Sequence, residues 1–171
     1  MQGGTFTTVA FPGATYTEAW GINNAGQVVG EYSTGSGVHG FLYQSGTYTD
    51  ITVPGATYTQ MRGIDNVGDM VGRFAVTKDH GLLISNGVLH VLNAPGASAT
   101  YASGVNDIKR IVGYEDIAGG TVGMADFRGN YIQITHPGSS NVQALGINNN
   151  LNAVGQYTDS QGVTHGFLIT P

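Results

Sequence analysis

The chain has 171 residues, which is enough for one globular core and short for two. Only 10% of the residues are charged, the net charge is −5, and the basic residues form no cluster beyond Lys109 and Arg110, so we expect no nucleic-acid partner. No apolar run approaches the roughly 20 residues that cross a bilayer, and cysteine is absent, which argues against membrane insertion and excludes disulfides and thiolate metal sites.

The chain opens with MQGGTFTTV, which lacks the basic region and apolar core of a signal peptide. Two expectations fit this start: a cytoplasmic protein, or an exported protein whose leader lies outside this sequence. The low content of Lys and Glu and the abundance of Gly, Thr, Asn and Tyr favour the second, a secreted or cell-envelope protein.

One stretch then occurs four times. Residues 11–32, FPGATYTEAWGINNAGQVVGEY, return as VPGATYTQMRGIDNVGDMVGRF, APGASATYASGVNDIKRIVGYE and HPGSSNVQALGINNNLNAVGQY. The prolines at positions 12, 54, 95 and 137 are separated by 42, 41 and 42 residues. We expect a single domain over 1–171, built from repeats at 11–52, 53–93, 94–135 and 136–171, the last completed by 1–10.

Each repeat predicts four short strands. The first ends in Gly-Ile/Val followed by Asn or Asp, and a turn rich in Asn, Asp and Gly leads to a second strand of the VVG type. A third apolar strand, such as HGFLY at 39–43, and a fourth alternating strand, such as TYTDITV at 47–53, complete the repeat. Apolar residues nowhere recur with helical spacing, so we expect an all-β fold with four antiparallel strands of about five residues per repeat.

The two ends of the chain suggest how the repeats are arranged. The last repeat stops after its third strand, at THGFLITP, whereas the chain begins with a spare fourth strand, GGTFTTVAF at 3–11. Gly4 precedes Pro12 by the same 8 residues as Gly46 precedes Pro54. A closed β-propeller uses such a split to join its first and last blades and to remove the open edge. We therefore predict a small closed four-bladed β-propeller with about 42 residues per blade, its last blade closed by the N-terminal strand.

The repeat resembles a known family, the bacterial extracellular repeats named HAF after a His-Ala-Phe triplet. The resemblance lies in GINNAGQVVGEY and in HGFLY at 39–43, and through the four copies it covers essentially the whole chain. Gly stands where the family has Ala, and the third repeat, TVGMADF, lacks the His. The resemblance implies an exported bacterial protein, often tied to the cell envelope, and it implies no enzyme class.

Residues that are the same in every repeat are expected to be scaffold. They are a glycine of the first strand, a glycine of the second strand, and the Asn or Asp before the hairpin turn (Gly21, Gly63, Gly104 and Gly146; Gly30, Gly72, Gly113 and Gly155; Asn23, Asp65, Asn106 and Asn148). The glycines indicate close approach between strands or blades, and the amides are expected to bond the local backbone.

Three histidines share one position on the third strand, His39, His80 and His165. Three such side chains suit zinc or copper if they converge, but third strands stand well away from the propeller axis, about 20 Å or more apart across the ring. We therefore expect no metal and no cofactor, and each imidazole is expected to bond a neighbouring strand or loop.

The residues expected to bind a ligand are those that differ between repeats while the framework stays fixed. They occupy alternating positions before the first-strand glycine, where four segments approach the axis on one rim (Tyr16, Glu18, Trp20, Tyr58, Gln60, Arg62, Tyr101, Ser103 and Gln143). Aromatic faces together with amides, Arg and Glu suit a glycan or a small organic ligand in a shallow cup. The alternative is that these side chains pack between blades and that Trp20 belongs to the core.

Three hypotheses about function follow. The first is an extracytoplasmic module that binds a glycan or small organic molecule at the central rim. The second is a structural disc of the cell envelope whose loops contact a protein partner. The third is a metal-independent enzyme, a lyase or hydrolase, with Glu18 or Tyr101 as general base and Arg62 as electrostatic stabiliser. No catalytic motif supports this third hypothesis, because phosphate loops, dinucleotide fingerprints and nucleophile elbows are all missing from the sequence.

Overall fold

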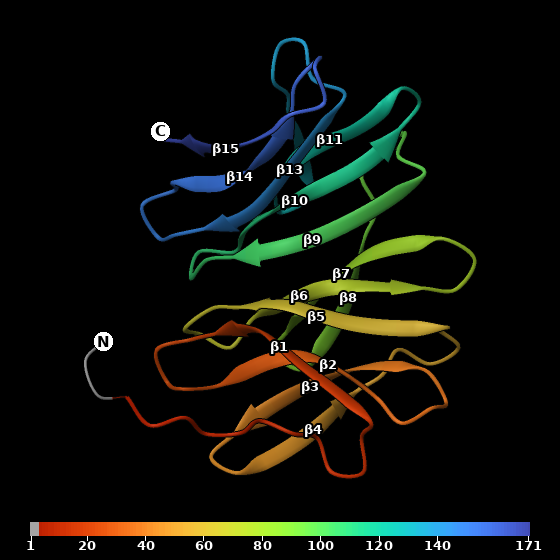
Figure 1. Cartoon of the computed structure of the whole chain (residues 1–171), viewed down its shortest axis with the longest axis vertical. Helices are drawn as coiled ribbons and strands as arrows, with labels where there is room; N and C mark the ends of the chain where they lie inside the picture. The colour runs from red at the N-terminus through yellow and green to blue at the C-terminus, as the bar shows by residue number, and fades with distance from the viewer. Residues whose placement is uncertain (1–3) are drawn as a thin grey trace.

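The computed structural model describes residues 4–171, and over this range the chain is all-β, as predicted. The fifteen strands form four successive antiparallel meanders, here called units 1 to 4 (Figure 1). Units 1 and 2 contain β1 (Tyr16–Ile22), β2 (Val28–Ser33), β3 (Val38–Gln44), β4 (Thr47–Ile51), β5 (Tyr58–Ile64), β6 (Met70–Ala75), β7 (Asp79–Ser85) and β8 (Val88–Leu92). Units 3 and 4 contain β9 (Ala99–Val105), β10 (Arg110–Ile117), β11 (Gly120–Phe127), β12 (Asn130–Ile134), β13 (Asn141–Ile147), β14 (Ala153–Thr158) and β15 (Thr164–Ile169).

The first hairpin of each unit is closed by its Asn or Asp, as the sequence predicts. Asn23 Oδ1 accepts the main-chain N–H groups of Ala25 and Gln27, and Asp65, Asn106 and Asn148 make the same pair of bonds in their turns. The fourth turn residue has positive φ, which Gly26 supplies without steric cost. In units 3 and 4 the same position is held by Lys109 and Leu151, at φ of 60° and 64°.

The repeated glycines serve close approach of backbones, as predicted, and the two sets do so differently. A Cβ on Gly21 would lie 3.1 Å from the Cα of Gly63, and the same contact joins Gly63 to Gly104 and Gly104 to Gly146. A Cβ on Gly30 would instead stand 1.9 Å from the carbonyl oxygen of Glu18 on the neighbouring strand, at a β-bulge. First-strand glycines therefore set the distance between units, and second-strand glycines set the geometry within one.

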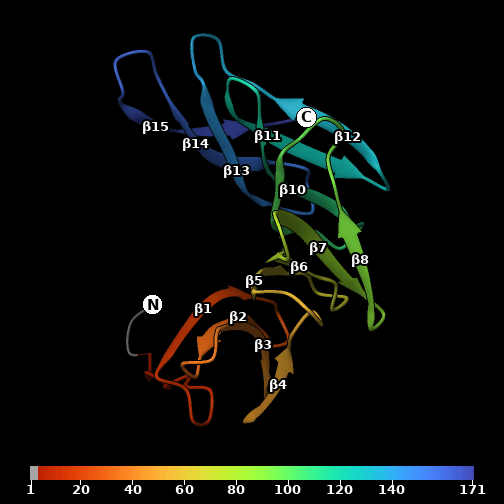
Figure 2. The same cartoon turned by 90° about the vertical axis from the view of Figure 1, so that its right-hand side faces the viewer.

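Consecutive units are placed side by side along an arc. A single parallel residue pair, Val38 with Tyr58, joins units 1 and 2 into one sheet, and Thr121 with Asn141 joins units 3 and 4 into another. The principal strand contacts between units join unit 1 to 2, 2 to 3 and 3 to 4. Figures 1 and 2 both place unit 1 at one end of the molecule and unit 4 at the other.

The predicted closure of the last blade by the N-terminal strand is wrong for this structure. Residues 4–10 form no strand, and β15, at the end of its sheet, pairs with β14 alone among the described residues. Phe11 instead stacks on Tyr32 of its own repeat, with ring centroids 3.6 Å apart, and the N–H of Ala10 bonds the hydroxyl of Tyr48. The same stack joins His136 to Tyr157, where the preceding strand β12 is paired, so it does not by itself prevent pairing. The ring stays open because units 1 and 4 lie at opposite ends of the molecule, so residues 4–10 do not meet β15. Four antiparallel strands per repeat are confirmed for units 1 to 3, and unit 4 has three.

The core lies between the units. Val29 of unit 1 packs against Met61 and Met70 of unit 2, and Val71 of unit 2 packs against Ala102 and Ile111 of unit 3. Unit 4 presents the equivalent valine, Val154, to solvent with 48% of its surface exposed, whereas Val29 is fully buried. A side chain at this position is therefore buried only when a following unit covers it.

Candidate functional site

The nine predicted binding residues lie on the first strands of the four units, and four of them pair directly with a variable residue of the second strand. Glu18 pairs directly with Glu31, Gln60 with Arg73, Tyr101 with Tyr114, and Gln143 with Gln156. We call these four pairs the variable layer. Glu31 lies two residues along β2 from Val29, so both side chains point toward unit 2. The pairs of units 1 to 3 thus lie in the spaces between units, beside the apolar core, whereas no following unit among the described residues covers the pair of unit 4.

Trp20 of unit 1 and Arg62 of unit 2 lie in contact beside the variable layer. The Arg62 guanidinium lies over the Trp20 ring, with its Cζ 3.8 Å from the ring centroid, so unit 2 covers one face of a unit 1 side chain. Trp20 nevertheless keeps 46% of its surface exposed. Trp20 is therefore not a core residue, and this position keeps an aromatic surface open to solvent.

Two carboxylates lie behind this pair. Glu31 is 7% exposed, and its Oε2 has no hydrogen-bond partner among the described residues. Burial raises the pKa of the Glu31 carboxyl, which the Arg62 guanidinium opposes and the neighbouring Glu18 reinforces. Tyr16 donates its hydroxyl proton to Glu18, and this bond to a carboxylate raises the pKa of Tyr16 to about 12. The site therefore combines an aromatic surface, a guanidinium and a directly opposed pair of acids.

A second cluster spans units 2 and 3 around Arg73. The Arg73 Nε donates to the side-chain oxygen of Gln60, and its guanidinium lies 5.5 Å from the ring centroid of Tyr58 and 5.3 Å from that of Tyr101. Tyr101 stacks on Tyr114 at 4.5 Å. One arginine from unit 2 thus connects aromatic side chains of two units.

Tyr101 is held from both sides by acids. Its hydroxyl donates to Asp116 at 3.0 Å and lies 3.5 Å from a carboxylate oxygen of Asp79 in the preceding unit. Burial, followed by these two acids, raises the pKa of Tyr101 well above its usual range. A phenol in this environment does not supply a phenolate at neutral pH, which argues against Tyr101 as a general base.

The remaining predicted residues lie apart from these two clusters. Gln143 accepts a bond from Gln156 at 3.1 Å within unit 4. Ser103 is half-buried at the repeat position of Trp20, and its carbonyl oxygen lies against Gly63. The predicted residues therefore form one cluster at the junction of units 1 and 2 and a second at the junction of units 2 and 3. Gln143 lies apart from both, in an amide pair on unit 4.

Sequence reasoning missed the second-strand half of the variable layer. Glu31, Arg73, Tyr114 and Gln156 each follow the repeated second-strand glycine and differ in every copy. The same search for variable positions next to fixed ones, applied to the second strand, would have found them. The expectation that the first strand alone approaches the axis leaves the second strand out of that search.

The hairpin turns of all four units line a separate polar pocket of about 230 Å³. In it a ladder of bonds runs from unit to unit: the main-chain N–H of Asn24 donates to Asn66 Oδ1, that of Asn66 to Asp107, and that of Asp107 to Asn149. Asn23 and Asn106 also donate through Nδ2 to the carbonyl oxygens of Asp65 and Asn148. These polar groups bond one another, so the pocket reads as part of the framework.

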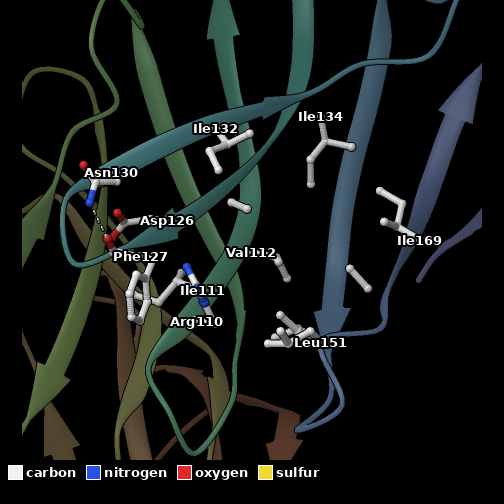
Figure 3. A pocket seen from close by; sticks show the side chains of 13 residues that line it. Arg110, Ile111, Val112, Asp126, Phe127, Asn130, Ile132, Ile134, Leu151 and Ile169 are labelled. Atoms are coloured by element: carbon white, nitrogen blue, oxygen red, sulfur yellow. Dashed lines mark hydrogen bonds between the residues drawn. The ribbon is translucent and has the colours of Figure 1, made fainter. Parts of the chain in front are cut away.

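An apolar cavity of about 320 Å³ lies between units 3 and 4 (Figure 3). Ile132 and Ile134 of β12 and Ile169 of β15 face it, and the Arg110 guanidinium stacks on the Phe127 ring at one end. Ala153, which lines this space, stands where unit 2 has the larger Met70, so a small side chain leaves part of the junction unfilled. The cavity therefore reflects loose packing of one junction more than a shaped polar site.

The three repeated histidines are hydrogen-bonded, as predicted, although they are not internal. His39 bonds Thr52, His80 bonds Asn93, and His165 bonds Asp159. Each imidazole also packs on the aromatic ring of its cross-strand partner, which is Tyr32, Phe74 or Tyr157. Unit 3 has lost both members of this pair, with Glu115 opposite Val122. Over residues 4–171 no group of three or more His, Asp or Glu side chains is arranged to hold a metal ion.

Sequence comparison finds no matching protein-family profile and no matching curated protein. Comparison of folds finds a partial likeness to a mutant of the lectin from Aleuria aurantia in complex with α-methyl-L-fucoside, with a TM-score of 0.46 and 18% identity. The likeness covers 83% of this chain and 52% of the lectin chain, so this chain spans about half the length of that protein. Similarity of this extent does not carry the lectin's ligand over to this chain. Within the described residues, no helix is long and apolar enough to cross a membrane.

Proposed function

We propose that this protein is a binding module for a hydroxylated ligand, a glycan or a small organic molecule, held at the inner strands of units 1 to 3. The observation that carries the proposal is the exposure of Trp20 next to Gly21, where the backbones of units 1 and 2 approach closely. An aromatic surface on a rigid strand binds the apolar face of a sugar ring. Removing such a surface from water on binding supplies the affinity.

Polar groups around Trp20 supply the rest of the chemistry that such a ligand needs. Arg62 offers donors, Glu18 offers acceptors, and Tyr16 carries an exposed hydroxyl on the same strand. The Arg73, Gln60 and Tyr101 cluster provides a similar combination at the next junction. Two related but unequal sites therefore lie along the arc, and an oligomeric ligand that reaches both would gain avidity.

The setting of this module is part of the proposal. The HAF-like repeat and the composition favour an exported protein, secreted or at the cell envelope. We further propose that the four units are a sector of a β-propeller, because each is an antiparallel meander whose first strand lies innermost and stacks on the next through glycine.

Isothermal titration calorimetry with a panel of mono- and oligosaccharides and small organic acids tests the proposal. A binder should lose its heat signal with Trp20→Ala and keep it with Leu145→Ala, which alters the same repeat position in unit 4. Circular dichroism confirms that both variants are folded. No heat with any member of the panel, or a binder that ignores Trp20→Ala, would contradict the proposal.

An enzyme is the second candidate, and the paired acids favour it. Glu18 and Glu31 stand directly opposite each other, and the buried Glu31 keeps its proton to higher pH than an ordinary carboxyl. Unequal carboxyl groups of this kind perform general acid and base steps in glycoside hydrolysis. Turnover of a bound glycan, lost in Glu31→Gln while binding remains, would establish it. Binding without turnover in the wild-type protein would leave the module a binder only.

A further inference from the structure

Among residues 4–171, no strand pairs with the outer edge of β15, and unit 4 has three strands. β15 ends its sheet and pairs only with β14 among the described residues, whereas each of the other three third strands pairs with a fourth strand. Leu168 of β15 is 63% exposed. A row of unpaired main-chain groups of this kind is a ready template for another strand.

The N-terminal segment carries the sequence of a fourth strand without forming one. Counted back from the repeated proline, Phe6 occupies the position of Tyr48, Leu89 and Tyr131, and Val9 that of Ile51, Leu92 and Ile134. Residues 4–10 make no strand, and Phe6 is fully exposed. The chain thus contains an exposed strand-forming segment and a free edge that lacks such a strand.

Residues 4–10, here called the arm, and the outer edge of β15 lie on different units of one molecule. Ala10 and Phe11 are fixed on unit 1, through the bond to Tyr48 and the stack on Tyr32, while β15 belongs to the opposite end of the arc. Residues 4–9 extended as a strand span about 20 Å from that anchor. This freedom allows the arm to reach a neighbouring molecule while its own unit stays intact.

We propose that residues 5–9 of one copy of the chain add to β15 of a second copy as the missing fourth strand. The register follows from the other units, where Leu42 pairs with Thr49, Leu83 with His90 and Ala125 with Ile132. By the same register Thr7 stands opposite Leu168. Phe6 stands opposite Ile169 and packs as Tyr48 does on Tyr43.

The absence of cysteine makes the test direct. Thr7→Cys and Leu168→Cys are prepared as separate proteins, mixed, and oxidised, so a disulfide between the two variants forms only between copies. The control pairs Thr7→Cys with Ser36→Cys, whose thiol lies in an exposed loop of unit 1. Because strand pairing raises the effective concentration of the two thiols, we expect the yield of mixed disulfide dimer from Thr7→Cys with Leu168→Cys to be about tenfold or more above that of the control.

Sedimentation of the cysteine-free chain supplies the second measurement. The wild-type protein should associate as concentration rises, and Thr7→Pro should stay monomeric, because proline removes a strand donor from a segment that makes no bond in the monomer. Ser36→Pro is the control and should associate as the wild type does. A monomer at all concentrations, association that survives Thr7→Pro, or no enrichment of the mixed disulfide would overturn the proposal. So would an intrachain disulfide in the Thr7→Cys/Leu168→Cys double variant at high dilution, since it would show the arm on its own chain.

Discussion

The fixed framework and the variable layer occupy the same strands and behave in opposite ways. At the first-strand glycines the backbones of neighbouring units approach too closely for a side chain to fit between them, and this holds at every junction. The residues just before these glycines, Trp20, Arg62, Ser103 and Leu145, differ in size and in charge. The second strands repeat the contrast, with a glycine fixed by the bulge and the next residue different in each unit. Geometry is therefore held by residues without side chains, which leaves adjacent side chains free to differ.

The junctions between units show how far this division goes. Junction 1–2 is filled by Met61 and Met70, and junction 3–4 has alanines at both positions and a cavity, yet the glycine contacts persist at both. Backbone approach fixes the arrangement of units, and side-chain volume then decides how well each junction is packed.

Gly72→Ala should have the largest effect, because it attacks the framework. The new Cβ would stand 2.0 Å from the carbonyl oxygen of Gln60, which no side-chain movement relieves. We expect a loss of roughly 4 kcal/mol or more in the free energy of unfolding, measured by urea denaturation. Gly4→Ala, where a Cβ meets nothing within 4 Å, is the control and should be neutral. A mild Gly72→Ala would mean that the bulge relaxes easily and that the framework is not rigid.

Met61→Ala and Ala153→Met separate the tight junction from the loose one. Truncation at fully buried Met61 should cost about 2–5 kcal/mol of stability. Methionine at Ala153, which lines the cavity, fills part of that space, so this change should be tolerated or raise the melting temperature. Equal destabilisation by both changes would show that the alanine junction is already full.

Asp65→Asn tests the hairpin turn of unit 2, the unit in which an aspartate replaces the asparagine found in the other three. Asp65 Oδ1 accepts the usual two turn bonds. Its Oδ2 is buried and has no partner among the described residues. At the same place Asn23 and Asn106 have an Nδ2 group that donates to a carbonyl oxygen of the next unit. Burial raises the pKa of Asp65. Folding therefore favours the protonated acid, and stability falls as pH rises from the ordinary carboxyl range to the folded-state pKa.

Asparagine cannot ionise, so the variant escapes this loss. We expect Asp65→Asn to stabilise the protein by about 1 kcal/mol at neutral pH, with the difference shrinking toward zero below the ordinary carboxyl pKa. Thermal melts at a series of pH values measure it. A constant difference at every pH would indicate that Asp65 ionisation plays no part.

Gln143→Ala should have the smallest effect. Its bond to Gln156 lies on the uncovered face of unit 4, so we expect a change below about 0.5 kcal/mol in the free energy of unfolding. A loss of several kcal/mol on chemical denaturation would place the variable layer within the framework and remove the distinction between the two.

The strands, the turns and the glycine contacts can be predicted from the sequence, because each depends on a local residue pattern that recurs in all four repeats. Asn23 at a hairpin turn and Gly21 beside the next unit are examples. The closed ring was not predictable from the length and pattern of residues 3–11 alone. Whether that segment pairs with β15 depends on the curvature of the four units taken together, which the repeat spacing does not specify.

The sequence predicts several residues of the candidate site but not the contacts between them. Variation between repeats located Trp20, Arg62 and Tyr101 on the inner strands, but no sequence signal stated that Arg62 lies over Trp20 or that Arg73 connects Tyr58 and Tyr101. Those contacts join residues about 40 positions apart across unit junctions, and they become visible only once the units are stacked.

The central claim is that Trp20 lines a binding surface formed with Arg62, and fluorescence of this single tryptophan tests it most directly. The wild-type protein and Arg62→Ala are titrated with the same panel of saccharides and small organic acids. We predict a saturable change in Trp20 emission with at least one ligand, and a weaker affinity for that ligand in Arg62→Ala. Emission that no panel member changes, in a protein whose Trp20 is freely quenched by iodide, would contradict the claim.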